Sequence, residues 1–494
     1  MLEEALEAAG LDDVEILSRA AAGARLQTAD RGALARFYAV WPLVVETHAP
    51  GVLIQQAVVD VEEAGSLQEA QKTLGGRLRA SRVDQPVRLP AVGPLVERYR
   101  RTDEPAEVRI RDATGDERLD RATARKVKAY EGLRPRRQIG DLDRRYLGEK
   151  REGRYRFASG IDPVAEGLVT ESDPYVGFIH ADGNAVGDFI TRMLNAADDS
   201  AAAFREFSSA LQDATEEAVQ DAVEDVLIAD HAARNPEASS AGRQGESTDA
   251  GDQIVLPARP IVLAGDDVTV IVAARLALDF TKRFLEAFER TTRERLGVLQ
   301  VPDFKGLTAG AGVVLAKYSF PFDRAHELAE SLCRQAKKWV KIGGGEIPSA
   351  LAFHRVTTSL PMSAETVLQH ELTSHTRGTD ETEAPVQPEG TETPKTIARR
   401  LTYEAYGVGA RHKEGLARLE DLQALAEALP PDQRGGIRSL LAVLHQSPER
   451  ATEAFERMCE VRSSRAGGKE ETRRLREALR TLTGAGDNGE LLWR

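Results

Sequence analysis

Two adjacent aspartates, Asp266 and Asp267, stand at the tip of an almost entirely apolar sequence, PIVLAGDDVTVIVA. Carboxylates placed in this way can bind a divalent cation, because hard cations prefer oxygen ligands. An ordinary solvated turn can contain the same pair, since aspartate is frequent in turns. A third carboxylate, Asp182, follows an earlier apolar stretch, YVGFIHA. These three acids are the candidate catalytic and metal-binding residues of the chain.

Two predicted strands must hold the adjacent acids. The apolar, β-branched segments 260–263 and 268–273 predict a hairpin, and Gly265 at their connection suits a tight turn. The segment that ends at Asp182 predicts another strand. Strand alternation gives His180 the same face as Asp182, so we expect His180 to be a neighbour of the site and not a ligand.

The order of predicted elements from residue 175 to residue 316 is β-α-β-β-α-β, which is the split βαβ pattern of a ferredoxin-like palm. In that fold the first strand lies antiparallel to the third, so Asp182 is expected beside Asp266 and Asp267. Three carboxylates together need a compensating charge, and Mg²⁺ or Mn²⁺ would supply it. Two such ions roughly 4 Å apart would support nucleotidyl transfer from a nucleoside triphosphate. The alternative is that each acid is separately solvated.

A triphosphate also needs positive charge. Lys337, Lys338 and Lys341 lie on a helix predicted over residues 323–341, with Asp323 as its N-cap. They could neutralise phosphate oxygens, although a polar helix face would contain the same lysines. Weaker candidates of this kind are Lys317 and Tyr318.

Composition limits the class of protein. The 494 residues suggest several domains, and a formal net charge of −13 excludes a general polyanion binder. Two distant cysteines exclude a disulfide framework or a cysteine-rich zinc site. No signal peptide or membrane span is predicted, which predicts a cytoplasmic protein without membrane contact.

The predicted fold class is α+β. An N-terminal α+β domain is expected over residues 1–170, the palm over 171–372, a flexible linker over 373–395 and a helical domain over 396–494. The linker is rich in Thr, Glu, Pro and Gly and has no periodicity. Residues 231–252 predict a mobile loop.

The N-terminal domain contains weaker patterns. A helix is expected to end or kink at Pro42, followed by a strand over 52–61, a helix over 65–79 and a hairpin near 108–116. This order indicates a half-formed βαββ unit. Residues 125–156 are rich in Arg and Lys, which could form a nucleic-acid patch or a solvated face. The tyrosines interleaved there are Tyr130, Tyr146 and Tyr155.

Three segments together resemble a known family: FIHADGNAVG, LAGDDVTVIV and LTAGAGVVLAKYSFPFDRAHELAESLCRQAKK. They resemble the second palm domain of the large subunit of type III CRISPR effector complexes, the Cas-ten or Cmr-two family, over residues 175–356. More distantly they resemble GGDEF-type diguanylate cyclases. The first resemblance implies a palm that makes cyclic oligoadenylates from ATP, with Asp266 and Asp267 as metal-binding turn acids. It also implies Asp182 as the strand-end ligand and Gly265 as the close-approach glycine.

The resemblance implies partners, and the sequence also differs from the family in several places. It implies CRISPR subunits and RNA as partners, and the cyclases imply a homodimer. Ala264 stands where the family has the first glycine of its Gly-Gly-Asp-Asp turn. Residues 1–170 contain no His-Asp pair, His48 being their one histidine, and no zinc-binding cysteine set lies between the palms. We therefore expect a degenerate first palm at the N-terminus and a shortened or stand-alone relative.

Three hypotheses follow. The leading one is a metal-dependent nucleotidyltransferase that makes a cyclic (oligo)nucleotide signal from ATP or another NTP in anti-phage defence. The second is a catalytically silent scaffold of a CRISPR ribonucleoprotein complex. The third, a GGDEF-like cyclase that uses GTP, is weakened because Asp267 and Val268 replace the Glu and Phe of that motif.

Overall fold

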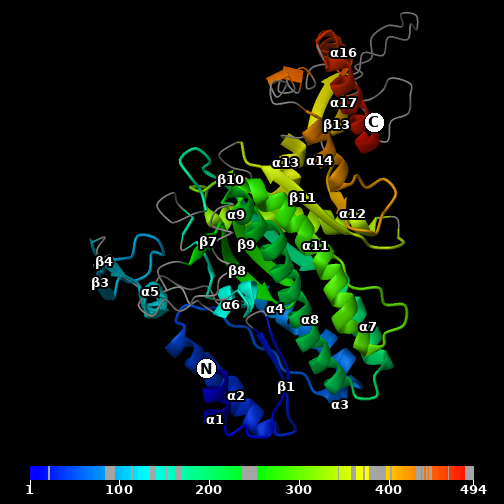
Figure 1. The fold of residues 1–494 in the computed structure, drawn as a ribbon. Helices are drawn as coiled ribbons and strands as arrows, with labels where there is room; N and C mark the ends of the chain where they lie inside the picture. The colour runs from blue at the N-terminus through cyan, green and yellow to red at the C-terminus, as the bar shows by residue number, and fades with distance from the viewer. Residues whose placement is uncertain are drawn as a thin grey trace, which may run out of the picture.

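The computed structural model describes residues 1–483 apart from 21–22, 84–94, 113–114, 134–140, 152, 159, 162–167, 236–252, 343, 358–362, 371–372, 378–395, 401–402, 430–434, 437–438, 441–442, 444–447 and 466. Among these residues, six strands form a central sheet in the order β14-β11-β10-β6-β9-β8 (Figure 1). Its strands are β6 (Tyr175–Gly183), β8 (Ala258–Ala264), β9 (Asp267–Ala273), β10 (Ala309–Lys317), β11 (Ser349–Arg355) and β14 (Tyr406–Val408).

The strand pairing confirms the predicted ferredoxin-like order. β6 is antiparallel to both β10 and β9, and β9 is antiparallel to β8. In order of sequence these four strands lie 4-1-3-2 across the sheet. β11 extends the sheet in parallel to β10, and β14 pairs antiparallel with β11 at the edge.

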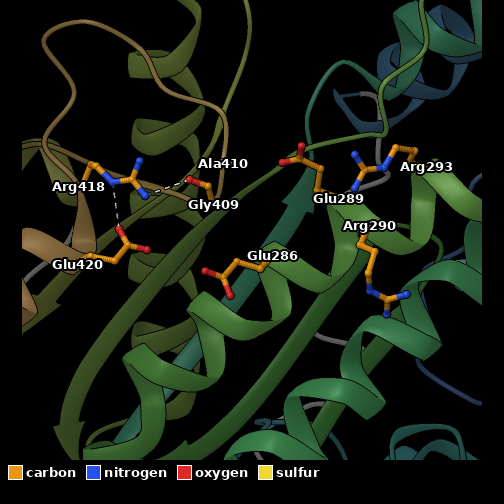
Figure 2. Close-up of a pocket in the computed structure, with 8 residues that line it drawn as sticks. All are labelled: Glu286, Glu289, Arg290, Arg293, Gly409, Ala410, Arg418 and Glu420. Carbon is orange, nitrogen blue, oxygen red and sulfur yellow. Dashed lines mark hydrogen bonds and ion pairs between the residues drawn. The ribbon is translucent and has the colours of Figure 1, made fainter.

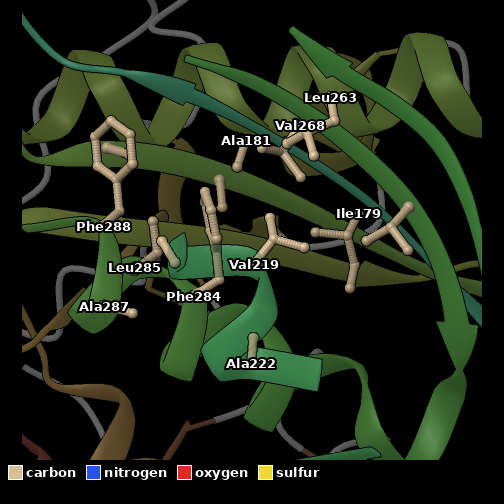
Figure 3. Close-up of a cluster of buried hydrophobic side chains, with 14 of the residues drawn as sticks. Ile179, Ala181, Val219, Ala222, Leu263, Val268, Phe284, Leu285, Ala287 and Phe288 are labelled. Carbon is tan, nitrogen blue, oxygen red and sulfur yellow. The ribbon is translucent and has the colours of Figure 1, made fainter. Parts of the chain in front are cut away.

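Helices cover both faces of the sheet, and this explains why its strands are almost continuously apolar. Ile179 and Ala181 of β6 point to the face covered by α8 and α11, where Phe284 and Phe288 complete a large core (Figure 3). Phe178 of β6 points to the opposite face, which α12 covers. The helices are α7 (Val186–Ala196), α8 (Ser200–Ala222) with a π-helical turn at Val223–Ile228, α9 (Ala229–Arg234), α11 (Ala274–Leu296) with a 3₁₀ turn at Gly297–Leu299, α12 (Phe322–Lys341) and α13 (Ala364–His370).

The N-terminal region differs from its prediction. Residues 15–20 and 23–27 pair as antiparallel strands, and α2 continues past Pro42. Residues 52–60 are described but form no strand, so the predicted strand there, and with it the half βαββ unit, is wrong. The helix expected over 65–79 is confirmed, and the antiparallel pairing expected near 108–116 is confirmed between residues 108–112 and 115–119. The elements are α1 (Leu2–Ala9), β1 (Glu15–Ala20), β2 (Gly23–Gln27), α2 (Arg31–His48), α3 (Val61–Ala64), α4 (Leu67–Val83), β3 (Val108–Asp112), β4 (Gly115–Leu119), α5 (Arg121–Leu133), α6 (Asp141–Leu147), β5 (Tyr155–Phe157) and β7 (Ile254–Leu256).

The C-terminal region is only partly helical. Thr373–Arg377 pairs as β12 with β13 (Thr396–Arg400), so the start of the predicted linker is a strand, and residues 378–395 lie outside the described residues. The loop predicted over 231–252 also lies mostly outside them. The expected helices follow as α14 (Leu419–Ala428), α16 (Pro448–Ser463) and α17 (Gly468–Thr483). No helix in the described part of the chain has the length and apolarity needed to span a bilayer.

Candidate active site

The three predicted acids meet at one end of the central sheet. In the register between β6 and β9, Ala181 lies opposite Val268, so Asp182 and Asp267 occupy the next position on each strand. Asp266 lies at the turn between β8 and β9. Its Oδ2 is 2.7 Å from the position that a Cβ at Gly183 would take, so the glycine leaves room for this carboxylate. The three acids therefore meet because of the strand register and because Gly183 has no side chain.

Burial and mutual repulsion raise the pKa of two of these acids. Burial raises the pKa of Asp266 to about 6, and the negative charge of Asp182 adds to the shift. Burial likewise raises the pKa of Asp267 to about 6, with further contributions from Asp182 and Glu330. Carboxyl groups in this state are stabilised as anions by a nearby cation.

Lys337 is the positive group at this site. Its Nζ donates hydrogen bonds to Asp182 Oδ2 and to the main-chain oxygen of Gly183, the latter at 2.6 Å. Lys338 and Lys341 are exposed, and in the described structure no hydrogen bond or ion pair joins either to the three acids. The structure thus brings Lys337, but not the other two lysines, to the predicted site.

Of the remaining sequence candidates, the structure places one at the site and two away from it. Gly265 has φ +64° and forms the turn that the prediction assigned to it. Lys317 and Tyr318 lie at the opposite end of the sheet, because Lys317 pairs with Tyr175 at the start of β6. At about 3.3 Å per residue this is roughly 23 Å from Asp182, so the structure does not bring these two candidates to the acids. The predicted N-cap of α12 was also wrong, because Pro321 holds that position in place of Asp323.

His180 is a neighbour of the acids, as expected. Its Nδ1 lies 3.1 Å from Thr269 Oγ1 and 3.5 Å from Asp267 Oδ1. Its ring stands edge-on to His326 at 5.6 Å between ring centroids. Burial lowers the pKa of His180, and His326 contributes to the shift, so the ring is predominantly neutral at pH 7.

Two residues that support the site were missed in the sequence. Tyr146, fully buried, places its hydroxyl 2.9 Å from the oxygen of Val262 and 3.2 Å from that of Thr269, so it braces the hairpin that carries the acids. Asn184 is also buried, and its Nδ2 donates to Thr308 Oγ1 at 3.1 Å, which fixes the end of β6. The Asp-Gly-Asn run after the strand was the available signal for Asn184.

The two tyrosines in the second half of the basic stretch over 125–156 are not on the surface. Tyr146 and Tyr155 are both buried, at 0% and 8% exposed, which excludes them as a base-stacking surface. The side chain of Tyr130 lies outside the described residues. For these two tyrosines the nucleic-acid interpretation was wrong, since they contribute to the core.

The chemistry of the donor set fits a hard divalent cation. Oδ1 of Asp267 is buried and has no hydrogen-bond partner among the described residues, and such an oxygen is an available ligand. As the side chains stand, the described residues contain no group of three His, Cys, Asp or Glu ready to hold a metal ion. Asp182 is paired with Lys337.

A separate cavity of about 370 Å³ lies beside α11 (Figure 2). None of the predicted site residues line it. Arg418 donates to the oxygen of Gly409 and pairs with Glu420 at its edge. The lining residues are Glu286, Glu289, Arg290, Arg293, Gly409, Ala410, Arg418 and Glu420.

The raised pKa values predict how stability depends on pH and metal. An unfolded aspartate ionises near pH 4, so between about pH 4 and 6 the folded protein binds more protons than the unfolded chain. Protonation of the two acids therefore stabilises the folded state, fully below about pH 4, and this stabilisation is lost as pH rises through about 6. Bound Mn²⁺ offsets the repulsion of the ionised acids. We therefore expect MnCl₂ to raise the melting temperature clearly at pH 7.5 and hardly at all at pH 5, in thermal unfolding scans.

A variant with Asp266 and Asp267 both replaced by alanine is the control for this measurement. It should show little response to MnCl₂ at either pH, because the ligands are missing. An equal rise in melting temperature at pH 5 and pH 7.5 for the unmodified protein would show that the ion binds elsewhere.

The fold and the acidic strand ends define a palm domain of ferredoxin-like topology. The family model described as "Cas10/Cmr2, second palm domain" matches residues 175–341, so this segment is similar to that domain. The match confirms the resemblance found in the sequence.

Solved structures give weaker likenesses. A crystal structure of a Csm1-Csm4 cassette in complex with cA4 is 12% identical, with a TM-score of 0.36, and the match covers 68% of this chain and 47% of that one. A crystal structure of Csm1 in T.onnurineus is 14% identical, with a TM-score of 0.34, over 69% of this chain and 47% of that one. The chain thus spans about half the length of these structures. A search of curated proteins finds no match.

Proposed function

We propose that the palm is a metal-dependent nucleotidyltransferase that converts ATP, or another NTP, into a cyclic (oligo)nucleotide signal for CRISPR-type antiviral defence. The observation that supports this most is the meeting of Asp182, Asp266 and Asp267 at one end of the sheet, beside Lys337. Cas10 palm domains of type III systems make cyclic oligoadenylate, and the family match of residues 175–341 supports the same chemistry here.

In this reaction the 3′-hydroxyl of one nucleotide loses its proton to solvent, its oxygen bonds to the α-phosphorus of another nucleotide, and the bond from that phosphorus to pyrophosphate breaks. A divalent cation, when bound, would stabilise the attacking and leaving oxygens. Asp182, Asp266 and Asp267 would hold Mg²⁺ or Mn²⁺ through carboxylate oxygens, among them Oδ1 of Asp267, which accepts no hydrogen bond from the described residues. The ammonium of Lys337 would stabilise the triphosphate, and Gly265 keeps side-chain bulk away from the turn.

The test is incubation of the purified protein with Mg²⁺ or Mn²⁺ and each labelled NTP in turn. We expect pyrophosphate and a cyclic product, with ATP as the preferred substrate, and no product in the presence of EDTA. Failure to obtain a product with any nucleotide, from protein shown to be folded, would count against the proposal.

A second candidate function is a catalytically silent scaffold of a CRISPR ribonucleoprotein complex. The observation that favours it is the pairing of Asp182 with Lys337, which engages one of the three acids in an ion pair. Affinity purification from cells separates the two functions. A scaffold should bring RNA and other subunits with it, and a protein recovered free of both is not a scaffold.

A further inference from the structure

Lys337 already occupies the position of a cation at the acidic site. Its ammonium is bound by a carboxylate oxygen of Asp182 and by the main-chain oxygen of Gly183. Carboxylate and carbonyl oxygens are also the ligands that a hard divalent cation takes from proteins. The lysine side chain is 18% exposed, so its charge is not simply solvated in water. An arriving divalent ion would find Asp182 already paired with Lys337.

Gly310 makes this position of Lys337 possible. It lies directly opposite Asp182 in the register between β10 and β6. A Cβ at Gly310 would be 2.3 Å from Cγ and 3.2 Å from Cδ of Lys337. The backbone of Gly310 is not in the left-handed region, so glycine is needed here for space and not for conformation. The stem of Lys337 crosses β10 through the gap that the missing side chain leaves.

We propose that Lys337 is a resident counter-cation, which competes with the divalent ion for Asp182 and moves to the triphosphate once the ion binds. An interaction made only in the metal-free state stabilises that state and therefore weakens metal binding. A bound ion repels the ammonium, which then becomes available to phosphate oxygens. The exchange rests on the proposed function, because it assumes that the acids take up a metal ion and a nucleotide.

The first experiment measures Mn²⁺ affinity in the absence of nucleotide, by electron paramagnetic resonance of free Mn²⁺. Lys337→Met should bind Mn²⁺ about tenfold more tightly than the unmodified protein, because a hydrogen-bonded ion pair no longer opposes binding. Lys338→Met, the same change at the next residue of α12, should leave the affinity unchanged, since Lys338 is exposed. Equal or weaker Mn²⁺ binding by Lys337→Met would overturn the proposal.

The Gly310→Ala variant tests whether the ion pair itself, and not only the positive charge of Lys337, weakens Mn²⁺ binding. This variant keeps Lys337 but pushes its stem off β10, so it too should bind Mn²⁺ more tightly. Gly297→Ala is the matched control, because a Cβ there would meet nothing within 4 Å. Unchanged Mn²⁺ affinity in folded Gly310→Ala would refute the role of the gap at Gly310 and of the contact between Lys337 and Asp182 that it permits.

The second half of the exchange is tested with 3′-deoxy-ATP, which lacks the attacking hydroxyl, at saturating Mn²⁺. Lys337→Met should bind this nucleotide about tenfold more weakly, and unchanged affinity would overturn transfer of the lysine to phosphate. The two proposals fail differently. Tighter Mn²⁺ binding by Lys337→Met in a protein that makes no product supports the exchange and contradicts the proposed function. Absence of Mn²⁺ binding in both proteins overturns the exchange as well.

Discussion

Replacing Asp266 and Asp267 together with alanine should reduce nucleotide synthesis by at least about a thousandfold, because cation stabilisation of the attacking and leaving oxygens contributes several kcal/mol. Both residues lie at a turn tip and contribute little to the core, so the fold should survive. Both carry carboxyl groups whose pKa is raised to about 6 by burial. At pH 7.5 their ionised forms destabilise the folded state, so the double variant should melt at the same temperature or higher.

The measurement pairs a labelled-ATP synthesis assay with thermal unfolding at pH 7.5. A double variant with Asp323 and Glu327 replaced by alanine removes two exposed carboxylates from α12, which are 72% and 56% exposed, and should keep full synthesis. Loss of folding in the Asp266 and Asp267 variant would assign these residues a structural role. Retained synthesis would place the reaction elsewhere on the chain.

Gly312→Ala should destabilise the palm more than any surface change. A Cβ at this position would lie 1.9 Å from the carbonyl oxygen of Ala329 and 2.6 Å from the backbone nitrogen of Cys333. Because both atoms belong to the main chain of α12, the whole helix must move away from β10. We expect a loss of about 3 kcal/mol in the free energy of unfolding, and a fall of roughly 10 °C in melting temperature.

Calorimetry or circular dichroism can follow this loss, with Gly297→Ala as the control that introduces the same methyl group into open space. Because α12 also carries Lys337, the Gly312 variant should lose the contact with Asp182 at the same time. A melting temperature within 1 or 2 °C of the unmodified protein, roughly the effect of a surface change, would mean that α12 does not pack against β10 as closely as described.

The position of the acids could be predicted because each step depends on local sequence. β-branched, apolar arms around Gly265 predict a hairpin, and the order of elements then places the first strand beside the third. The same reasoning failed for residues 52–60, because an apolar run forms a strand only where a neighbouring strand can pair with it. It also missed the antiparallel pair formed by residues 15–20 and 23–27, whose sequences have weak alternation.

The choice among the lysines shows where local reasoning ends. Lys337, Lys338 and Lys341 were equal candidates in the sequence, but packing of α12 across Gly310 brings Lys337 to Asp182 and leaves the others exposed. Tyr146 was interpreted as a possible surface residue, although it is buried and lies 116 positions from Val262, which it contacts. Contacts of this kind cannot be derived from spacing.

The sequence by itself determined the palm topology and the meeting of Asp182, Asp266 and Asp267, because strand periodicity and chain order are local properties that permit few arrangements. Tertiary structure alone decided the electrostatics of that site. Burial raises the carboxyl pKa values, and two glycines, Gly183 and Gly310, leave space for an acid and for a lysine. Such effects depend on which atoms approach one another in three dimensions, and residues far apart in the chain supply those atoms.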